Sequence, residues 1–159
     1  MRFGFSLYSL ALCLLISALI ASALIDYDHG YIPDGAHICI FLAAFIAMLS
    51  AQSIPLAQRF FGSAIIPAIM ALVSLLTHGG IGMGDIKLFV AVGFFLGLKL
   101  SIPAFFLGYI LAFLFLIPKM LRKQLHKTQE IHMAPYFALS IFIISVFGNQ
   151  LVDFYISLL

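Results

Sequence analysis

Two segments of this sequence place an aspartate at the end of an apolar run. Residues 78–85 (HGGIGMGD) are rich in glycine and end in Asp85, which leads into an apolar segment. A second apolar segment closes at Asp26. Holding a carboxylate next to hydrocarbon is costly, so a functional role is the first interpretation of both residues. Asp26 and Asp85 are therefore a candidate catalytic pair.

Two carboxylates suit the hydrolysis of a peptide bond. At short range they cannot both ionise readily, so the pair shares a proton. The ionised member can accept a proton from water while the protonated member donates to the scissile carbonyl oxygen, and the roles reverse as the amine leaves. The glycines Gly79, Gly80, Gly82 and Gly84 permit positive φ angles and a close approach of substrate backbone beside Asp85. This chemistry needs no metal ion and no other cofactor.

The composition places these aspartates in a membrane protein. The chain has 159 residues, of which 64% are hydrophobic and 9% are charged, whereas about a quarter of the residues in a soluble domain are charged. We expect an all-α integral membrane protein with one domain over residues 1–159. A formal net charge of +2 is too small to indicate nucleic-acid binding. Cys13 and Cys39 form no paired-cysteine zinc motif, so no metal site is expected.

Apolar windows near the length of a membrane crossing predict six transmembrane helices. Their bounds are 3–25, 36–51, 60–76, 85–98, 102–117 and 134–158. The first is longer than a usual signal-peptide core, so it is expected to be a retained span. The break between the fourth and fifth spans is expected around Lys99, Ser101 and Pro103, because proline and polar residues interrupt the apolar pattern there.

The polar segment 119–132 indicates how these spans are oriented. Its basic residues are Lys119, Arg122, Lys123 and Lys127. Basic loops belong to the cytoplasmic side of a membrane. The loops after the first, third and fifth spans share one side, so Asp26 and Asp85 would lie at the same depth, facing the cytoplasm. We expect a multi-pass protein of the inner (plasma) membrane with both chain termini outside.

Three motifs, in this order, carry a resemblance to a known family. Residues 26–34 (DYDHGYIPD) follow an Asp-x5-Ile-Pro-Asp pattern, residues 82–88 (GMGDIKL) contain Gly-x-Gly-Asp, and residues 134–139 (APYFAL) open the last span. Together they resemble the type IV prepilin peptidases, membrane aspartyl peptidases of the GxGD class. The resemblance covers nearly the whole chain and implies the GxGD-type aspartyl protease architecture.

The resemblance also implies an activity and a set of site residues. It implies cleavage of the short basic leader of type IV prepilins or pseudopilins, the latter belonging to type II secretion, at the cytoplasmic membrane face. Asp26 and Asp85 would be the catalytic residues. The residues expected to bind substrate or shape the site are Gly82, Gly84, Lys87, Pro33 and Asp34. Family members that also methylate the new amino terminus commonly carry an N-terminal cysteine-rich region, which this sequence lacks, so methyltransferase activity is not expected.

Other interpretations of the same residues stay open. Lys87 could keep Asp85 ionised or be an interfacial lysine, and Asp34 could cap the second span. The main alternative function is a small proton-coupled transporter or channel, which would place its carboxylates near mid-span. A structural subunit or an inactive paralogue is a third. Membrane lipid is an expected partner, nucleic acid is not, and homo-oligomer formation is left open.

Overall fold

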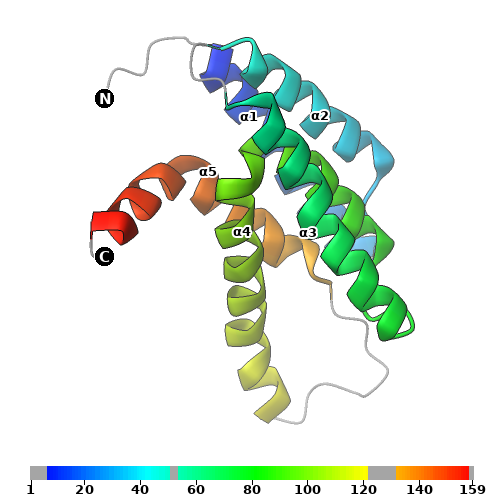
Figure 1. The fold of residues 1–159 in the computed structure, drawn as a ribbon. Helices are drawn as coiled ribbons and strands as arrows, with labels where there is room; N and C mark the ends of the chain where they lie inside the picture. The colour runs from blue at the N-terminus through cyan, green and yellow to red at the C-terminus, as the bar shows by residue number, and fades with distance from the viewer. Residues whose placement is uncertain (1–6, 51–53, 122–131, 158–159) are drawn as a thin grey trace.

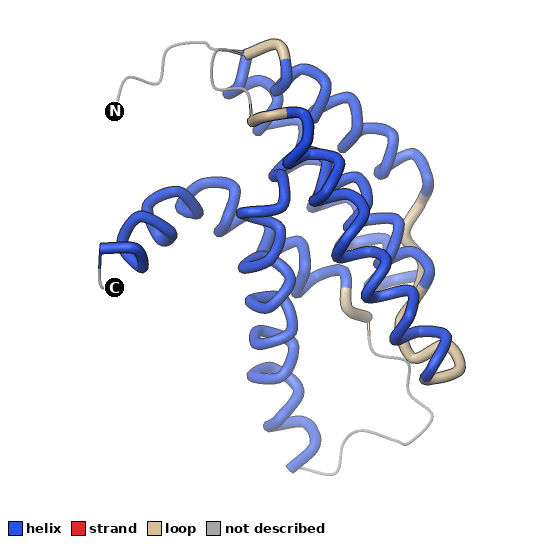
Figure 2. Tube along the Cα trace, viewed as in Figure 1, coloured by secondary structure: helices blue, strands red, loops and turns tan. Residues whose placement is uncertain are grey.

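All regular structure in the described part of the chain is helical. The computed structural model describes residues 7–50, 54–121 and 132–157. The helices in this part are α1 (Leu7–His29), α2 (Asp34–Met48), α3 (Leu56–Leu76), α4 (Met83–Leu121) and α5 (Ala134–Ser157), as Figures 1 and 2 show. α3 packs along α4, while α2 and α5 each pack against both α1 and α4.

The length and surface of these helices fit a membrane protein. Leu7–His29, Leu56–Leu76 and Met83–Ile117 are long and apolar enough to cross a bilayer, whereas Asp34–Met48 and Ala134–Gly148 are apolar but shorter. Large apolar side chains point outward, as a bundle surrounded by lipid requires; examples are Leu24, Leu75 and Phe113. The expected all-α membrane fold is confirmed, and the count of six spans stays a prediction.

The fourth and fifth predicted spans are joined at Gly97 without a loop. Lys99, Ser101 and Pro103, which were expected in the connection, are helical, so the predicted position of the break is wrong. α4 instead changes direction at Gly97, whose φ of 71° and ψ of 170° are not helical (Figure 1). Glycine adopts this positive φ without the penalty that a Cβ would bring. The Ser101 hydroxyl donates to the Gly97 carbonyl at 2.7 Å and so satisfies a backbone acceptor at the break.

The first part of α4 lies unusually close to α3. A Cβ added at Gly62 would come within 2.6 Å of the Gly93 carbonyl oxygen, and a Cβ at Gly93 would overlap the Gly62 backbone. Small residues at a helix crossing allow this approach in membranes. The two glycines therefore allow the close packing of α3 against α4. The loop that precedes Asp85 connects these two helices.

A buried arginine closes the same pair of helices near Gly97. Arg59 on α3 is 1% exposed, and its Nη1 donates to the Phe94 carbonyl at 2.9 Å. Its Nε donates to the Ile54 carbonyl at 3.3 Å. Carbonyls just before a helix break lack their usual partners, and a cation is favourable at that end of a helix. Arg59 is thus a packing residue that holds the end of the first α4 segment against α3.

An aromatic cluster joins the two segments of α4 to α5. The ring of Phe89 contacts the rings of Phe105 and Phe137, with centroid distances of 5.5 and 4.9 Å. Tyr109 contacts Phe105 at 4.9 Å and Phe137 at 5.3 Å. Edge-to-face contacts of this kind stabilise beyond their buried area. The cluster brings Tyr109, from the second segment of α4, to the side of the first.

The connections after α1 and after α3 lie at the same end of the bundle, on the right in Figure 1. The start of α5 is at this end as well, because the Ala134 amide is hydrogen-bonded to Asp26. The segments that carry the two aspartates are therefore brought together by the fold. Residues Arg2, Arg122, Lys123 and Lys127, on which the predicted orientation partly rests, lie outside the described residues.

Candidate active site

Asp26 and Asp85 line one cavity. The cavity has a volume of about 290 Å³ and lies between the last turn of α1 and the first turn of α4. The other residues that line it are Gly30, Tyr31, Ile32, Asp34, Gly82, Met83, Gly84 and Lys87. All the predicted site residues except Pro33 are in this set. Pro33 connects Ile32 to Asp34 as the N-cap residue of α2.

The Asp26 carboxylate is anchored by the start of the last helix. The Ala134 amide donates to Asp26 Oδ2 at 3.2 Å, and the Asp26 residue is only 7% exposed. Free amides and the dipole at a helix N-terminus favour a neighbouring anion. The sequence marked residues 134–139 as a motif without a role for them, and the structure shows that their backbone holds one of the two aspartates.

Asp85 is positioned by the glycines before it. The Ile86 amide donates to the Gly82 carbonyl at 3.3 Å, so the chain turns into α4 directly at the motif. A Cβ at Gly84 would lie 3.4 Å from the side chain of Ile32, and a Cβ at Gly82 would lie 3.5 Å from Asp85 Oδ2. Both distances are ordinary van der Waals contacts, so an added Cβ would fit at either position, and its absence leaves the space beside Ile32 and the Asp85 carboxylate open.

Backbone conformation gives only some of these glycines a special role. Among the described residues, the glycines with positive φ are Gly30, Gly79 and Gly97, and His78 has a φ of 53°. Gly80, Gly82 and Gly84 do not use the positive φ that the sequence permits. Their contribution to the site is space, whereas His78 and Gly79 make the turn that ends α3.

Asp34 and Lys87 form an ion pair at the rim of the cavity. Lys87 Nζ donates to Asp34 Oδ1 at 2.9 Å, and the two side chains are 53% and 76% exposed, respectively. The N-cap residue of α2 is Pro33 and Asp34 is the first residue of the helix, so the alternative in which Asp34 caps the second span is wrong. Asp34 is exposed and lies before the predicted second span, 36–51. The hydrogen bond from Lys87 lowers the pKa of its carboxyl group. Lys87 is thus paired with Asp34 and not with Asp85.

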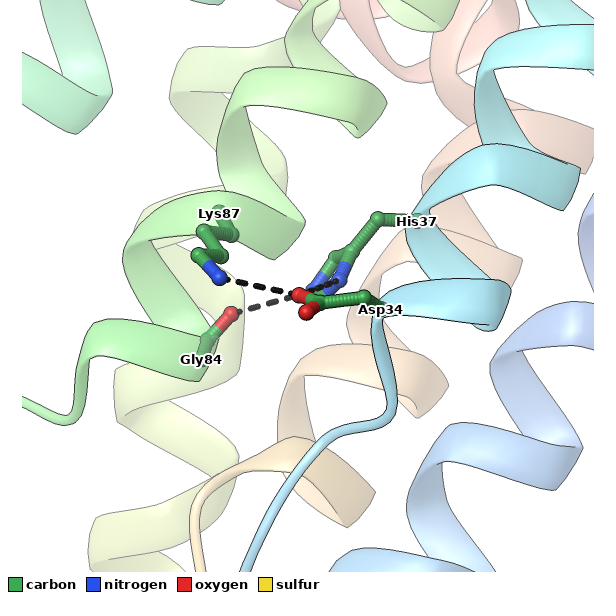
Figure 3. A network of polar contacts seen from close by, with 4 residues as sticks. All are labelled: Asp34, His37, Gly84 and Lys87. Carbon is green, nitrogen blue, oxygen red and sulfur yellow. Dashed lines mark hydrogen bonds and ion pairs between the residues drawn. The ribbon is translucent and has the colours of Figure 1, made fainter.

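His37 is a buried neighbour of this ion pair that the sequence interpretation left without a role. Figure 3 shows its ring, the Lys87 ammonium and the Asp34 carboxylate converging beside the Gly84 carbonyl. His37 Nε2 lies 3.3 Å from the Gly84 oxygen, and Nδ1 lies 3.7 Å from Asp34 Oδ1. The residue is 6% exposed. No local pattern marks its contact to Gly84, because Gly84 lies on another helix.

A second cavity meets the first at the aspartates. It has a volume of about 640 Å³ and shares Asp26, Gly30, Gly82 and Asp85 with the smaller one. Its other lining residues are Val73, Gly79, Gly80, Ile81, Tyr109, His132 and Met133. Tyr109 and His132 are polar groups that the sequence did not indicate, and Tyr109 reaches the cavity only because α4 folds back at Gly97. The two aspartates therefore lie where a substrate chain could extend to either side.

Within residues 7–50, 54–121 and 132–157, no three histidine, cysteine, aspartate or glutamate side chains gather as a metal site would require. The titratable groups that face the first cavity are Asp26, Tyr31, Asp34, Asp85 and Lys87. Of these, Asp34 and Lys87 neutralise each other, which leaves the two aspartates as the carboxylates available for acid–base chemistry.

Comparison with known proteins supports a peptidase family. Residues 13–117 match the model of the type IV leader peptidase family. The chain is 34% identical over 160 residues to a prepilin leader peptidase/N-methyltransferase of Bacillus subtilis, covering 99% of this chain and 63% of that protein. It is 26% identical to a prepilin leader peptidase/N-methyltransferase of Xanthomonas campestris, covering 98% of this chain and 56% of that protein. No solved structure matches the chain.

A shorter similarity extends to a third relative. A type 4 prepilin-like proteins leader peptide-processing enzyme of Escherichia coli is 34% identical over 103 residues, which is 60% of this chain and 38% of that protein. The chain thus spans less than two thirds of the length of these relatives. The matched range 13–117 contains both Asp26 and Asp85. This chain belongs to the type IV leader peptidase family.

Proposed function

We propose that this protein is an aspartyl endopeptidase that removes the short basic leader of type IV prepilins or pseudopilins. Asp26 and Asp85 would be its catalytic acid–base pair. The observation that carries the proposal is the cavity that both aspartates line, at the ends of helices that are far apart in the sequence. The relatives are named for leader peptide processing, and the proposal extends that activity to this chain.

The mechanism needs one proton shared between the two carboxylates. The amide hydrogen bond from Ala134 favours Asp26 as the ionised member, and Asp85 then carries the proton. Asp26 accepts a proton from water as the water oxygen attacks the peptide carbonyl carbon, and Asp85 donates its proton to the carbonyl oxygen. When the C–N bond breaks, Asp26 returns a proton to the leaving amine and Asp85 takes one from the tetrahedral intermediate, so the starting state is restored.

The surroundings of the pair suit a peptide at the membrane surface. Asp34 and Lys87 at the cavity rim are exposed, which gives water a route to the aspartates. We propose that this rim faces the cytoplasm and that the protein lies in the plasma membrane, as the basic segment 119–132 predicts. We propose no methyl transfer for this chain, which spans 63% or less of the length of the relatives named for it.

The transporter alternative is less well supported. A relay of protons across a membrane would require carboxylates near the middle of the spans. Asp26 lies in the last turn of α1 and Asp85 in the first turn of α4. Carboxylates at the helix ends favour hydrolysis of a substrate that arrives from the membrane surface.

Co-expression with a prepilin tests the function. The probe is a prepilin that the Bacillus subtilis relative processes, with that relative as the positive control. We expect the wild-type chain to convert the precursor to the shorter product on a gel, and Asp85→Asn to leave it uncut while accumulating in the membrane. An uncut precursor with wild-type protein present, or full processing by Asp85→Asn, would contradict the proposal.

A further inference from the structure

His37 makes a long-range contact to the peptide that carries Asp85. It lies on α2, and its Nε2 is 3.3 Å from the carbonyl oxygen of Gly84 on α4. A carbonyl oxygen only accepts hydrogen bonds, so the hydrogen must be on Nε2 of the imidazole. The Gly84 carbonyl belongs to the peptide group that joins Gly84 to Asp85. The ring therefore fixes the orientation of the backbone unit directly before the Asp85 side chain.

The other ring nitrogen of His37 lies beside the ion pair of Asp34 and Lys87. His37 Nδ1 is buried without a hydrogen-bond partner and lies 3.7 Å from Asp34 Oδ1, the same oxygen that accepts from Lys87. Gly84 directly precedes Asp85 in the sequence, and Lys87 lies two residues after it. Both are thereby tied to α2, one through His37 and one through Asp34. Two contacts from α2 therefore reach α4, one just before Asp85 and one just after it in the sequence; Figure 3 shows the residues that make them.

A purely structural histidine in an apolar bundle explains these contacts less well. Burying the ring leaves Nδ1 unsatisfied, which costs free energy that an apolar residue of similar size would avoid. The one hydrogen bond that the ring does make is to the motif that carries Asp85. An interaction that is poor for packing but well placed for the motif indicates a role in aligning Asp85.

We propose that His37 is a positioning residue for Asp85, acting through the Nε2–H hydrogen bond to the Gly84 carbonyl. This inference rests on the proposed peptidase function for its kinetic consequence. Without the bond, the peptide before Asp85 can rotate, and the carboxylate moves relative to Asp26 and the attacked carbonyl. A misplacement of about 1 Å lowers catalytic rates by roughly 100-fold. His37 does not contact the reacting atoms, so substrate affinity should be preserved.

Two substitutions separate the hydrogen bond from the bulk of the ring. Glutamine at this position can present an amide N–H at about the reach of Nε2, whereas leucine fills the space without a donor. We expect His37→Leu to lower kcat on the prepilin probe by about 10- to 100-fold with KM unchanged. His37→Gln should stay close to wild type. Cys39→Leu, on the exposed face of the same helix, is the matched control.

Hydrogen exchange gives a readout that does not depend on activity. Exchange of the backbone amides of residues 84–88 should be faster in His37→Leu than in wild type, His37→Gln and Cys39→Leu. Wild-type kcat in His37→Leu, equal loss in the glutamine and leucine variants, or a change confined to KM would overturn the positioning role. If wild-type protein leaves the prepilin uncut, the proposed function fails, and unchanged exchange in His37→Leu would then overturn the positioning role separately.

Discussion

Each aspartate of the candidate pair is held by a part of the chain distant from it in sequence. Asp26 accepts a hydrogen bond from the Ala134 amide at the start of α5. Asp85 sits between Gly84 and Lys87, which contact His37 and Asp34 on α2. Preorganised supports of this kind keep catalytic groups within the narrow range of geometry that a reaction tolerates. The candidate site is therefore built by α1, α2, α4 and α5, although the two aspartates themselves lie in two short sequence motifs.

Asp34 gives a prediction about stability and pH. The pKa of Asp34 is lowered by its bond to Lys87, so the ion pair stabilises the fold at neutral pH. That contribution is complete above the ordinary carboxyl pKa of about 4 and is lost as the pH falls through the lowered value. We expect Asp34→Asn to have a slightly lower Tm than wild type at pH 7. The difference should disappear on acidification, as measured by thermal unfolding in detergent.

Lys87→Met controls for the partner. Because the pair is exposed, its effect should be small and should weaken with added salt. The two single substitutions remove the same contact, so the double variant should lose no more than either one. Additive losses, or a Tm difference that persists at low pH, would show that Asp34 stabilises the fold by some other contact.

The sequence predicted the acidic residues of the candidate site but not the groups that hold them. Asp26 and Asp85 could be predicted because a carboxylate beside an apolar run and a glycine-rich segment are local signals. His37, Tyr109 and the Ala134 amide could not be, since each acquires its role from a partner on another helix. For Asp34, the local pattern allows a capping role beside the predicted site role, whereas its carboxylate bonds Lys87 on another helix.

At the scale of helices, the close crossing of α3 and α4 sets where Asp85 lies. A Cβ at Gly93 would overlap the backbone of Gly62, and neither backbone can move without shifting its helix. We expect Gly93→Ala to destabilise the protein by about 1–3 kcal/mol, as overpacking of a tight contact does. Denaturant unfolding in detergent measures the change, and the amount of protein in the membrane should fall in parallel.

Gly35→Ala is the matched control for this substitution. Gly35 is also helical, on α2, but an added Cβ would meet nothing within 4 Å. Alanine there should leave the stability unchanged or raise it by up to about 1 kcal/mol, because glycine is the poorer helix former. Equal effects of the two substitutions would mean that the α3–α4 crossing is looser than the structure has it.

The bounds of the helices were only partly predictable. The apolar windows located each helical segment, because a chain in lipid must satisfy its own backbone hydrogen bonds. The break in α4 was expected at Lys99, Ser101 and Pro103, where the apolar pattern is interrupted, and it occurs at Gly97. There the positive φ of glycine and the packing of Gly97 against Ile54 and Gln58 decide the position. Hydropathy does not record either of these effects.

At the scale of the whole molecule, the fold predicts which connections share a side of the membrane. His29 is the last residue of α1 and His78 follows α3, so both are at the end of the bundle that carries the aspartates; α3, with Pro55 as its N-cap residue, begins at the other end (Figure 1). Cysteines introduced one at a time at these positions can be labelled with a reagent that does not cross membranes. The background must lack Cys13 and Cys39, because both are exposed free thiols.

We expect the cysteines at positions 29 and 78 to react from the cytoplasmic side and the one at 55 to react from outside. Reaction of 29 and 78 from opposite sides would contradict the shared cavity itself. Reaction of both from the outside would leave the cavity intact and overturn only the predicted cytoplasmic orientation, which rests on the basic segment 119–132.

The most direct test of the catalytic pair is the rate of prepilin cleavage per unit of membrane-inserted protein in Asp26→Asn, Asp85→Asn and Asp28→Asn. Asparagine keeps the shape of each side chain and removes its acid–base function. Asp28 is exposed, two residues beyond Asp26, and is absent from the lining of both cavities. We expect Asp26→Asn and Asp85→Asn each to abolish cleavage and Asp28→Asn to cleave as wild type does. Cleavage at the wild-type rate by either of the first two would contradict the catalytic pair.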